Sequence, residues 1–238
     1  MHDYSKLISY LSSYNVSVTD DQIHQLDTYY EMIIETNKSL NLTAITEFDD
    51  VLVKHFIDSV TIVRDMDMSR EISMIDVGTG AGFPGMVLKI IFPNLKVTLF
   101  DSLQKRLTFL EGVISNLNLK DISTCHGRAE EAARDKKMRE SFDLCVSRAV
   151  ANLPVLSELC LPFVKVGGKF ISYKSDKGSE ELANASHALS ILGAALVKED
   201  IFTLPDSDMI RNLIIISKDK PCPGAYPRKP GTPSRKPL

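Results

Sequence analysis

Residues Met74–Gly85 have the sequence MIDVGTGAGFPG, and the organisation of the whole chain follows from them. A short apolar run, Ile72–Val77, leads directly into a loop with glycine at every second position. Pro84 then opens the next periodic segment, as proline does at the first position of a helix. A strand, a glycine-rich turn and a helix N-terminus together favour a charged or phosphate-like ligand group, because glycine lets the backbone amides approach it closely.

The segments on either side of this stretch have different periodicities. Residues 1 to about 66 have a helical pattern, with a capping box at Thr19–Gln22 and a second periodic segment at Phe48–Val63. From residue 72 onward, apolar runs alternate with helical segments, which predicts a mostly parallel sheet with helices on both faces. These runs are Ile72–Val77, Lys96–Phe100, Ile122–Cys125, Phe142–Ser147 and Lys169–Lys174.

The last two apolar runs, Leu196–Leu204 and Asn212–Ser217, have only a turn between them and should pair antiparallel at the sheet edge. We therefore expect an α/β fold of the Rossmann-like class I S-adenosylmethionine-dependent methyltransferases, with a mostly parallel seven-stranded sheet and an antiparallel last strand. The expected parts are an N-terminal helical cap (residues 1–68), the methyltransferase domain (69–220) and a basic, Pro-rich tail (221–238).

Composition narrows the class of protein. The net charge of −3 argues against a general nucleic-acid coat, although it permits a local basic face. The four cysteines form no C-x-x-C pair and have no metal-ligand spacing. No apolar run reaches the roughly 18 residues of a membrane span, and the N-terminus lacks the layout of a signal peptide. We expect a cytoplasmic monomer with no metal and no membrane partner.

Two registers compete for the glycine loop. Gly80-x-Gly82-x-x-Gly85 matches the dinucleotide fingerprint, but there the first glycine should follow the strand directly, and Gly78 does so here. The spacing Asp76-x-Gly78-x-Gly80-x-Gly82 suits S-adenosylmethionine better. An acidic group can meet the ammonium of this cofactor while backbone amides face its carboxylate. The alternative is a tight turn with no ligand.

Two later loops extend the candidate cofactor site. Asp101 ends the next strand, where a carboxylate can accept hydrogen bonds from ribose hydroxyls or cap the helix that begins near Leu103. The loop Gly127–Glu131 borders the adenine in this fold, although the same residues also suit a plain helix start.

The loop after the fourth strand points to the acceptor atom. It has the sequence Ser147-Arg148-Ala149-Val150, without the Asp/Asn-Pro-Pro-Tyr/Phe motif of amine-directed methyltransferases. Cys145 lies inside the strand and gives no signature of a cysteine nucleophile. A ring nitrogen such as guanine N7 has a free lone pair and needs no general base, so positioning and electrostatics can suffice. Arg148 is the candidate catalytic residue, since its planar fork suits guanine O6 or a phosphate; the alternative is a salt-bridge role.

Seven segments together resemble the rRNA small subunit methyltransferase G family, also called glucose-inhibited division protein B. They occur in the family's order and span nearly the whole chain: Asn41–Ile45, His55–Ser59, Asp76–Gly85, Asp101–Arg106, Arg128–Glu130, Ser147–Ala151 and Tyr226–Pro233. The resemblance implies a bacterial enzyme that methylates N7 of a guanine in the decoding-region loop of 16S rRNA. It also implies S-adenosylmethionine as the methyl donor, 16S rRNA or the small ribosomal subunit as partner, and no metal.

The resemblance also implies site residues. Gly78, Phe83, Ala129, Glu130 and Arg148 match the family's cofactor-contacting positions, beside Asp76, Gly80, Gly82 and Asp101 from the loop and fold arguments. The segment Tyr173–Gly178 departs from the family, whose members vary there. The basic residues expected to contact RNA phosphates are Arg228, Lys229, Arg235 and Lys236 in the tail, with Lys105 and Arg106 beside the cofactor loop. A disordered tail is the alternative.

His55 and Asp58 stand one turn apart on the second cap helix, either as a buried, mutually bonded pair or at the mouth of the cleft. Two other function classes remain open. One is a nicotinamide-dinucleotide-dependent oxidoreductase that uses the other glycine register. The second is a non-catalytic RNA-binding module with a vestigial cofactor loop.

Overall fold

The computed structural model describes all 238 residues and contains one seven-stranded sheet in the order β3-β2-β1-β4-β5-β7-β6. Strands β1 to β5 are parallel to one another, and β7 lies between β5 and β6, antiparallel to both. The strands are Ser73–Val77 (β1), Lys96–Asp101 (β2), Ile122–His126 (β3), Phe142–Arg148 (β4), Val164–Lys174 (β5), Ala194–Thr203 (β6) and Ile210–Lys218 (β7). The expected sheet with its antiparallel end is confirmed.

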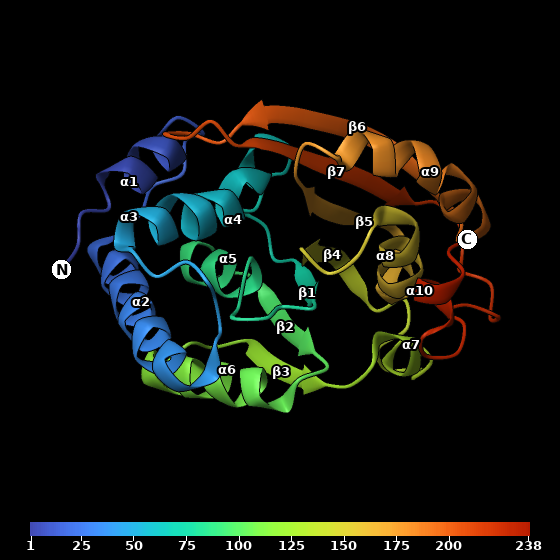
Figure 1. The fold of residues 1–238 in the computed structure, drawn as a ribbon, viewed down its shortest axis with the longest axis horizontal. Coiled ribbons are helices and arrows are strands. Elements are labelled where there is room, and N and C mark those ends of the chain that lie inside the picture. Colours follow the sequence, from blue (N-terminus) through green and yellow to red (C-terminus); the bar gives the residue numbers. More distant parts are fainter.

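Helices cover both faces of this sheet, and Figure 1 shows them as two groups to the left and the right of the strands. The α-helices are Ser5–Ser12 (α1), Asp20–Leu40 (α2), Phe48–Val51 (α3), Asp58–Val60 (α4), Gly85–Ile91 (α5), Gln104–Asn116 (α6), Ala129–Ala132 (α7), Leu153–Cys160 (α8), Gly178–Ile191 (α9) and Thr232–Arg235 (α10). A π-helical segment, Leu52–Ile57 (η1), and two 3₁₀ segments, Thr61–Arg64 (η2) and Leu161–Phe163 (η3), complete the set.

The cap begins with local signals that the sequence carries plainly. Thr19 accepts a hydrogen bond from the Gln22 amide, and the Gln22 side chain accepts one from the Thr19 amide. This reciprocal capping box satisfies two helix-end donors and starts α2 at Asp20. The second periodic segment is not one regular helix: α3, η1, α4 and η2 follow one another without a break. A π-helical turn within a helix is frequently found at a functional site, and η1 carries His55.

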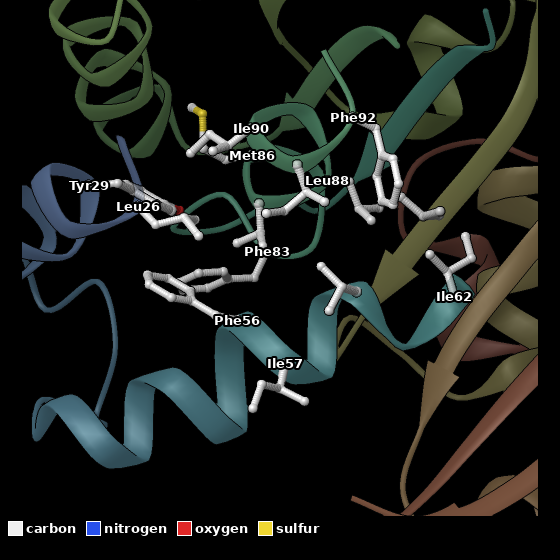
Figure 2. Close-up of a cluster of buried hydrophobic side chains, with 14 of the residues drawn as sticks. Leu26, Tyr29, Phe56, Ile57, Ile62, Phe83, Met86, Leu88, Ile90 and Phe92 are labelled. Atoms are coloured by element: carbon white, nitrogen blue, oxygen red, sulfur yellow. The ribbon is translucent and has the colours of Figure 1, made fainter. Parts of the chain in front are cut away.

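Cap and sheet share one hydrophobic core. Leu26 of α2 and Phe56 of η1 belong to the same buried cluster as Met86 of α5 and Met74 and Leu99 of the sheet. Figure 2 shows the Phe56 and Phe83 rings side by side in this cluster. A second cluster fills the opposite face, between the sheet and helices α7 to α9. The proposed boundary at residues 68 and 69 therefore marks a change in architecture within a continuous core.

The C-terminal segment, residues 221–238, packs against the body of the protein. Arg139 donates hydrogen bonds to the carbonyls of Cys222 and Tyr226, and Arg134 donates one to Pro227. Cys222 and Pro227 are buried. The alternative of a disordered tail is wrong for this structure, because side chains of the body satisfy the segment's backbone acceptors.

Candidate active site

Two cavities lie side by side at the carboxyl ends of the parallel strands, the usual place for ligands in open α/β sheets. The first, of about 330 Å³, is lined by Gly78 after β1, Asp101 after β2 and the loop that ends in Glu130. The second, of about 580 Å³, is lined by His55 and Asp58 of the cap, Arg148 of β4, Lys174 of β5 and Arg211 of β7. Ala149 and Val150 line both cavities, so the loop after β4 separates them.

The three alternate glycines of the loop serve three different purposes. All three have positive φ angles, which favour glycine. A Cβ atom on Gly78 would lie 2.3 Å from a methyl of Val150, and one on Gly82 would lie 2.5 Å from the Tyr29 hydroxyl. A Cβ on Gly80 would meet nothing closer than 4.0 Å. Gly78 thus makes room for the β4 loop and Gly82 for the cap, while Gly80 leaves open space above the turn.

Asp76 holds the loop from beneath. One of its carboxylate oxygens accepts hydrogen bonds from the Thr79 hydroxyl (2.7 Å) and the Gly85 amide (2.9 Å). Its relative exposure is 0%, and burial raises its pKa to about 6 although those two hydrogen bonds oppose the shift. The expected contact between Asp76 and the ammonium of a cofactor stays a prediction: the carboxylate has no exposed surface, although its second oxygen has no hydrogen-bond partner. Its role is to shape the turn.

Asp101 has one of the two roles that the sequence left open, the capping of α6, and it also lines the first cavity. Its carboxylate accepts hydrogen bonds from the Leu103 amide at the start of α6 and from the Gly80 amide, both at 2.9 Å. The side chain also lines the 330 Å³ cavity. The capping role is therefore present, and the same carboxylate remains in place for a ligand hydroxyl, because each carboxylate oxygen can accept more than one hydrogen bond.

Ala129 and Glu130 both line the first cavity from the start of α7. Glu130 is almost fully buried, and one of its oxygens accepts a hydrogen bond from the Gly231 amide at 3.0 Å. Its carboxylate therefore faces the cavity and the C-terminal segment at once.

Arg148 is the centre of a network that joins the cap to the sheet. Its guanidinium donates to Asp58 at 2.7 Å and to the Lys54 carbonyl at 3.2 Å, and lies 5.1 Å from the centre of the Phe83 ring. Asp58 binds a second guanidinium, that of Arg211, at 2.8 Å. Two guanidinium groups on one buried carboxylate leave a net positive charge in the second cavity, which suits acceptor atoms of an anionic ligand.

The expected bond between His55 and Asp58 is wrong. His55 contacts the Thr43 hydroxyl through Nε2 at 2.9 Å and Arg148 through Nδ1 at 3.3 Å, because Asp58 is occupied by the two guanidinium groups. Burial, reinforced by the Arg148 charge, lowers the pKa of His55 to about 4. The imidazole is therefore neutral at pH 7, and it stacks on Phe83 with 4.4 Å between ring centres.

Phe83 lies away from the first cavity and supports the second. Its ring packs against Tyr29 and Phe56 of the cap and beneath His55 and Arg148. The expected set of cofactor contacts thus divides. Gly78, Asp101, Ala129 and Glu130 line the first cavity, Arg148 lines the second, and Asp76, Gly82 and Phe83 support the walls from behind.

Comparison with known proteins identifies the family. The model of the family described as GidB, rRNA small subunit methyltransferase G, matches residues 22–208. The chain belongs to this family. It is 51% identical to the ribosomal RNA small subunit methyltransferase G of Alkaliphilus metalliredigens over 93% of this chain and 92% of that protein. It is 50% identical to the protein of that name from Lachnoclostridium phytofermentans, over 100% of this chain and 98% of that one.

Solved structures of lower identity support the fold. A methyltransferase from Pyrococcus furiosus matches with a TM-score of 0.55 and 18% identity, covering 80% of this chain and 95% of that one. TrmN from Thermus thermophilus matches with a TM-score of 0.53 and 16% identity, covering 70% and 53%. The expected fold and the methyltransferase class are confirmed. The oxidoreductase and the non-catalytic RNA-binding module find no support in the family match.

Sequence reasoning missed Arg211 in this family member. Arg211 lies in β7, 153 positions after Asp58, and no motif marks it. Lys174 also lines the second cavity, but its ammonium binds Glu181 at 2.7 Å. Lys174 belongs to the segment Tyr173–Gly178, for which the sequence indicates only a departure from the family pattern. A search for polar residues at the ends of predicted sheet strands would have found both, at the cost of many irrelevant candidates.

The basic residues expected to contact RNA have different surroundings. Lys105, Lys229, Arg235 and Lys236 are exposed. Arg106 is 3.5 Å from Asp101 and lines the first cavity. Arg228 is only partly exposed, and its guanidinium pairs with the buried Glu158 at 2.6 Å, which does not favour the expected contact with RNA.

No group of three or more His, Cys, Asp or Glu side chains has the arrangement of a metal site. None of the helices combines the length and apolar character needed to cross a membrane.

Proposed function

We propose that this chain transfers a methyl group from S-adenosylmethionine to N7 of a guanine in the decoding-region loop of 16S rRNA. The observation that carries the proposal is the pair of cavities on either side of Ala149 and Val150. One has the features of a nucleoside pocket, and its neighbour has the charge of a site for a nucleic-acid base. The relatives of this chain in the family are named as methyltransferases of small-subunit rRNA.

The residues of the first cavity fit the cofactor. A volume of about 330 Å³ lies within the range of small-molecule pockets, roughly 300–1,000 Å³. Asp101 offers acceptors for ribose hydroxyls, and Ala129 and Glu130 flank the position of the base. The open space above Gly80 leaves the turn accessible to a carboxylate group. When bound, S-adenosylmethionine supplies an electrophilic methyl group attached to a sulfonium.

The second cavity suits a guanine that reacts at N7. The two terminal nitrogens of Arg148 contact Asp58, Lys54 and His55, whereas its Nε–H makes no hydrogen bond within the chain. That donor, with the second N–H of each terminal nitrogen of Arg211, is available for guanine O6 or for a phosphate. A guanidinium that binds O6 alone leaves the N7 lone pair free.

No side chain in the second cavity is prepared as a general base, and N7 methylation needs none. Asp58 is held by two guanidinium groups, and His55 has a pKa of about 4. The chain's contribution is to hold the base in line with the methyl donor, which in favourable cases lowers a barrier by roughly 7–11 kcal/mol.

The exposed residues Lys105, Lys229, Arg235 and Lys236 remain the proposed contacts with RNA phosphates, joined by Arg211 in place of Arg228. We place the reaction in the cytoplasm with rRNA or the small subunit as partner. We propose that the chain acts as a monomer.

Methyl transfer to small ribosomal particles that lack the modification tests this function. Treatment with borohydride and aniline then cleaves RNA at N7-methylguanine, and we expect one new cleavage in the decoding-region loop. Methyl incorporation without cleavage would move the reaction to another atom, and no incorporation in any rRNA would overturn the proposal.

A further inference from the structure

The C-terminal segment, residues 221–238, reaches the cofactor cavity. Ser234 is one of the residues that line the 330 Å³ cavity, beside Asp101 and Glu130. The amide of Gly231 donates a hydrogen bond to Glu130 at 3.0 Å. Pro233 between them is buried. The segment Gly231–Ser234 therefore forms part of the cavity wall, although it lies more than 80 positions after every strand-end residue of the cavity.

A buried ion pair holds this segment in place. Glu158 of α8 has a relative exposure of 0% and accepts hydrogen bonds from three donors of Arg228: the amide at 2.7 Å, Nε at 2.9 Å and Nη2 at 2.6 Å. Nη2 also donates to the carbonyl of Lys236 at 2.8 Å. Arg228 therefore fixes both ends of the turn formed by residues 229–236. A charge on the fully buried Glu158 would be strongly destabilising without a partner, so Glu158 favours the position of Arg228 seen here.

We propose that residues 229–236 form a fixed wall of the cofactor pocket at the end lined by Asp101 and Glu130, and that Arg228 is the positioning residue that holds it. The proposal rests on the use of that cavity for S-adenosylmethionine. It assigns the basic segment a cofactor-binding role that its composition alone does not suggest. A preformed wall strengthens binding because the ligand does not have to order the segment.

The first test compares Arg228→Ala with Lys220→Ala. Both remove one positive charge from the last 20 residues, but Lys220 is exposed, makes no ion pair and lies outside residues 229–236. Calorimetry with S-adenosylhomocysteine should show binding about tenfold weaker for Arg228→Ala, since several side chains lose their preset positions. The Lys220→Ala protein should bind it within about twofold of the wild type. Affinity for unmethylated small ribosomal particles, measured at saturating S-adenosylhomocysteine, should fall by less than the affinity for S-adenosylhomocysteine, because Lys229, Arg235 and Lys236 keep their charges in Arg228→Ala.

A second variant keeps the ion pair and disturbs only the wall. Gly231 has a φ of +78°, which proline cannot adopt, and Gly231→Pro also removes the amide that binds Glu130. Gly224→Pro is the matched control, since the Gly224 amide makes no hydrogen bond and its surroundings are open. We expect Gly231→Pro, but not Gly224→Pro, to weaken S-adenosylhomocysteine binding about tenfold. This variant decides the matter if Arg228→Ala fails to fold.

Limited trypsin digestion gives a readout independent of affinity. S-adenosylhomocysteine should slow cleavage after Arg235 in the wild type and should lose that effect in Gly231→Pro. Wild-type affinity in both Arg228→Ala and Gly231→Pro would overturn the wall, as would a loss confined to RNA affinity. A wild-type protein that does not bind S-adenosylhomocysteine at all would instead overturn the proposed function.

Discussion

The two cavities beside Ala149 and Val150 are built in different ways. The first is made mainly of backbone turns and carboxylates at the ends of successive strands, which are local features of the chain, and Ser234 is its one distant part. The second depends on Asp58, which binds Arg148 from 90 positions away and Arg211 from 153 positions away. Cofactor pockets can therefore be recognised from short motifs, whereas an acceptor pocket of this kind exists only once the fold has formed.

The largest expected effect is on the cofactor side alone. Gly80→Val should weaken S-adenosylhomocysteine binding by up to roughly 100-fold, because overlap with the ligand costs up to about 3 kcal/mol and the side chain fills the open space above the turn. RNA binding should persist. Gly167→Val is the control: Gly167 also has a positive φ and open surroundings, but it lines neither cavity. Calorimetry that shows normal binding by Gly80→Val would mean that the turn is not the cofactor site.

The complementary change acts on the acceptor side. Asp58→Asn keeps the shape of the side chain but removes the charge that holds Arg148 and Arg211. Methyl transfer should fall about 100-fold, because a misplacement of the order of 1 Å is sufficient for such a loss. Affinity for S-adenosylhomocysteine should stay within about twofold. An equal loss of cofactor affinity would show that the two cavities do not act separately. Asp49→Asn, at an exposed cap residue, serves as the control.

These two experiments also show what sequence could and could not predict. The mostly parallel sheet with its antiparallel end, the capping box at Thr19 and the places of Gly78 and Asp101 at the ends of their strands were predicted, because each depends on neighbours in the chain. Gly82 was misassigned, since its purpose is to admit Tyr29 from the cap. The pairing of Arg228 with Glu158 was missed for the same reason. Contacts between distant segments leave no periodic or spacing signal.

A smaller effect concerns the pH dependence of the unfolding free energy, to which His55 of the second cavity contributes. His55 has a folded-state pKa of about 4, below its ordinary 6.5, so the unfolded chain binds a proton more readily between these values. The stability gained above pH 6.5 is lost as the pH falls toward 4. The wild type should therefore lose about 2 kcal/mol of unfolding free energy, relative to His55→Gln, between pH 7 and pH 5. Urea denaturation at the two pH values measures this difference.

The exposed His187→Gln variant is the control and should keep the wild-type pH dependence. Asp76 beneath the cofactor loop acts in the opposite direction. Its folded-state pKa of about 6 lies above the ordinary 3.8, so the stability it contributes at low pH is lost as the pH rises through 6. The wild type should consequently vary less with pH than His55→Gln. A His55→Gln protein with the wild-type profile would contradict the buried, neutral imidazole.

The smallest effect concerns the loop that separates the cavities. Ala149 has a φ of +58°, a left-handed conformation that costs a residue with a side chain roughly 1–2 kcal/mol. Ala149→Gly removes this strain but gives the unfolded chain more freedom, so we expect a net gain of up to about 1 kcal/mol in unfolding free energy. Ala151→Gly, at a position with ordinary φ, should instead lose roughly 0.5–1 kcal/mol. Strain retained at a residue that lines both cavities suggests that it holds Val150 in place against Gly78. If thermal or urea unfolding gave the two variants the same sign, the strain would not be stored at Ala149.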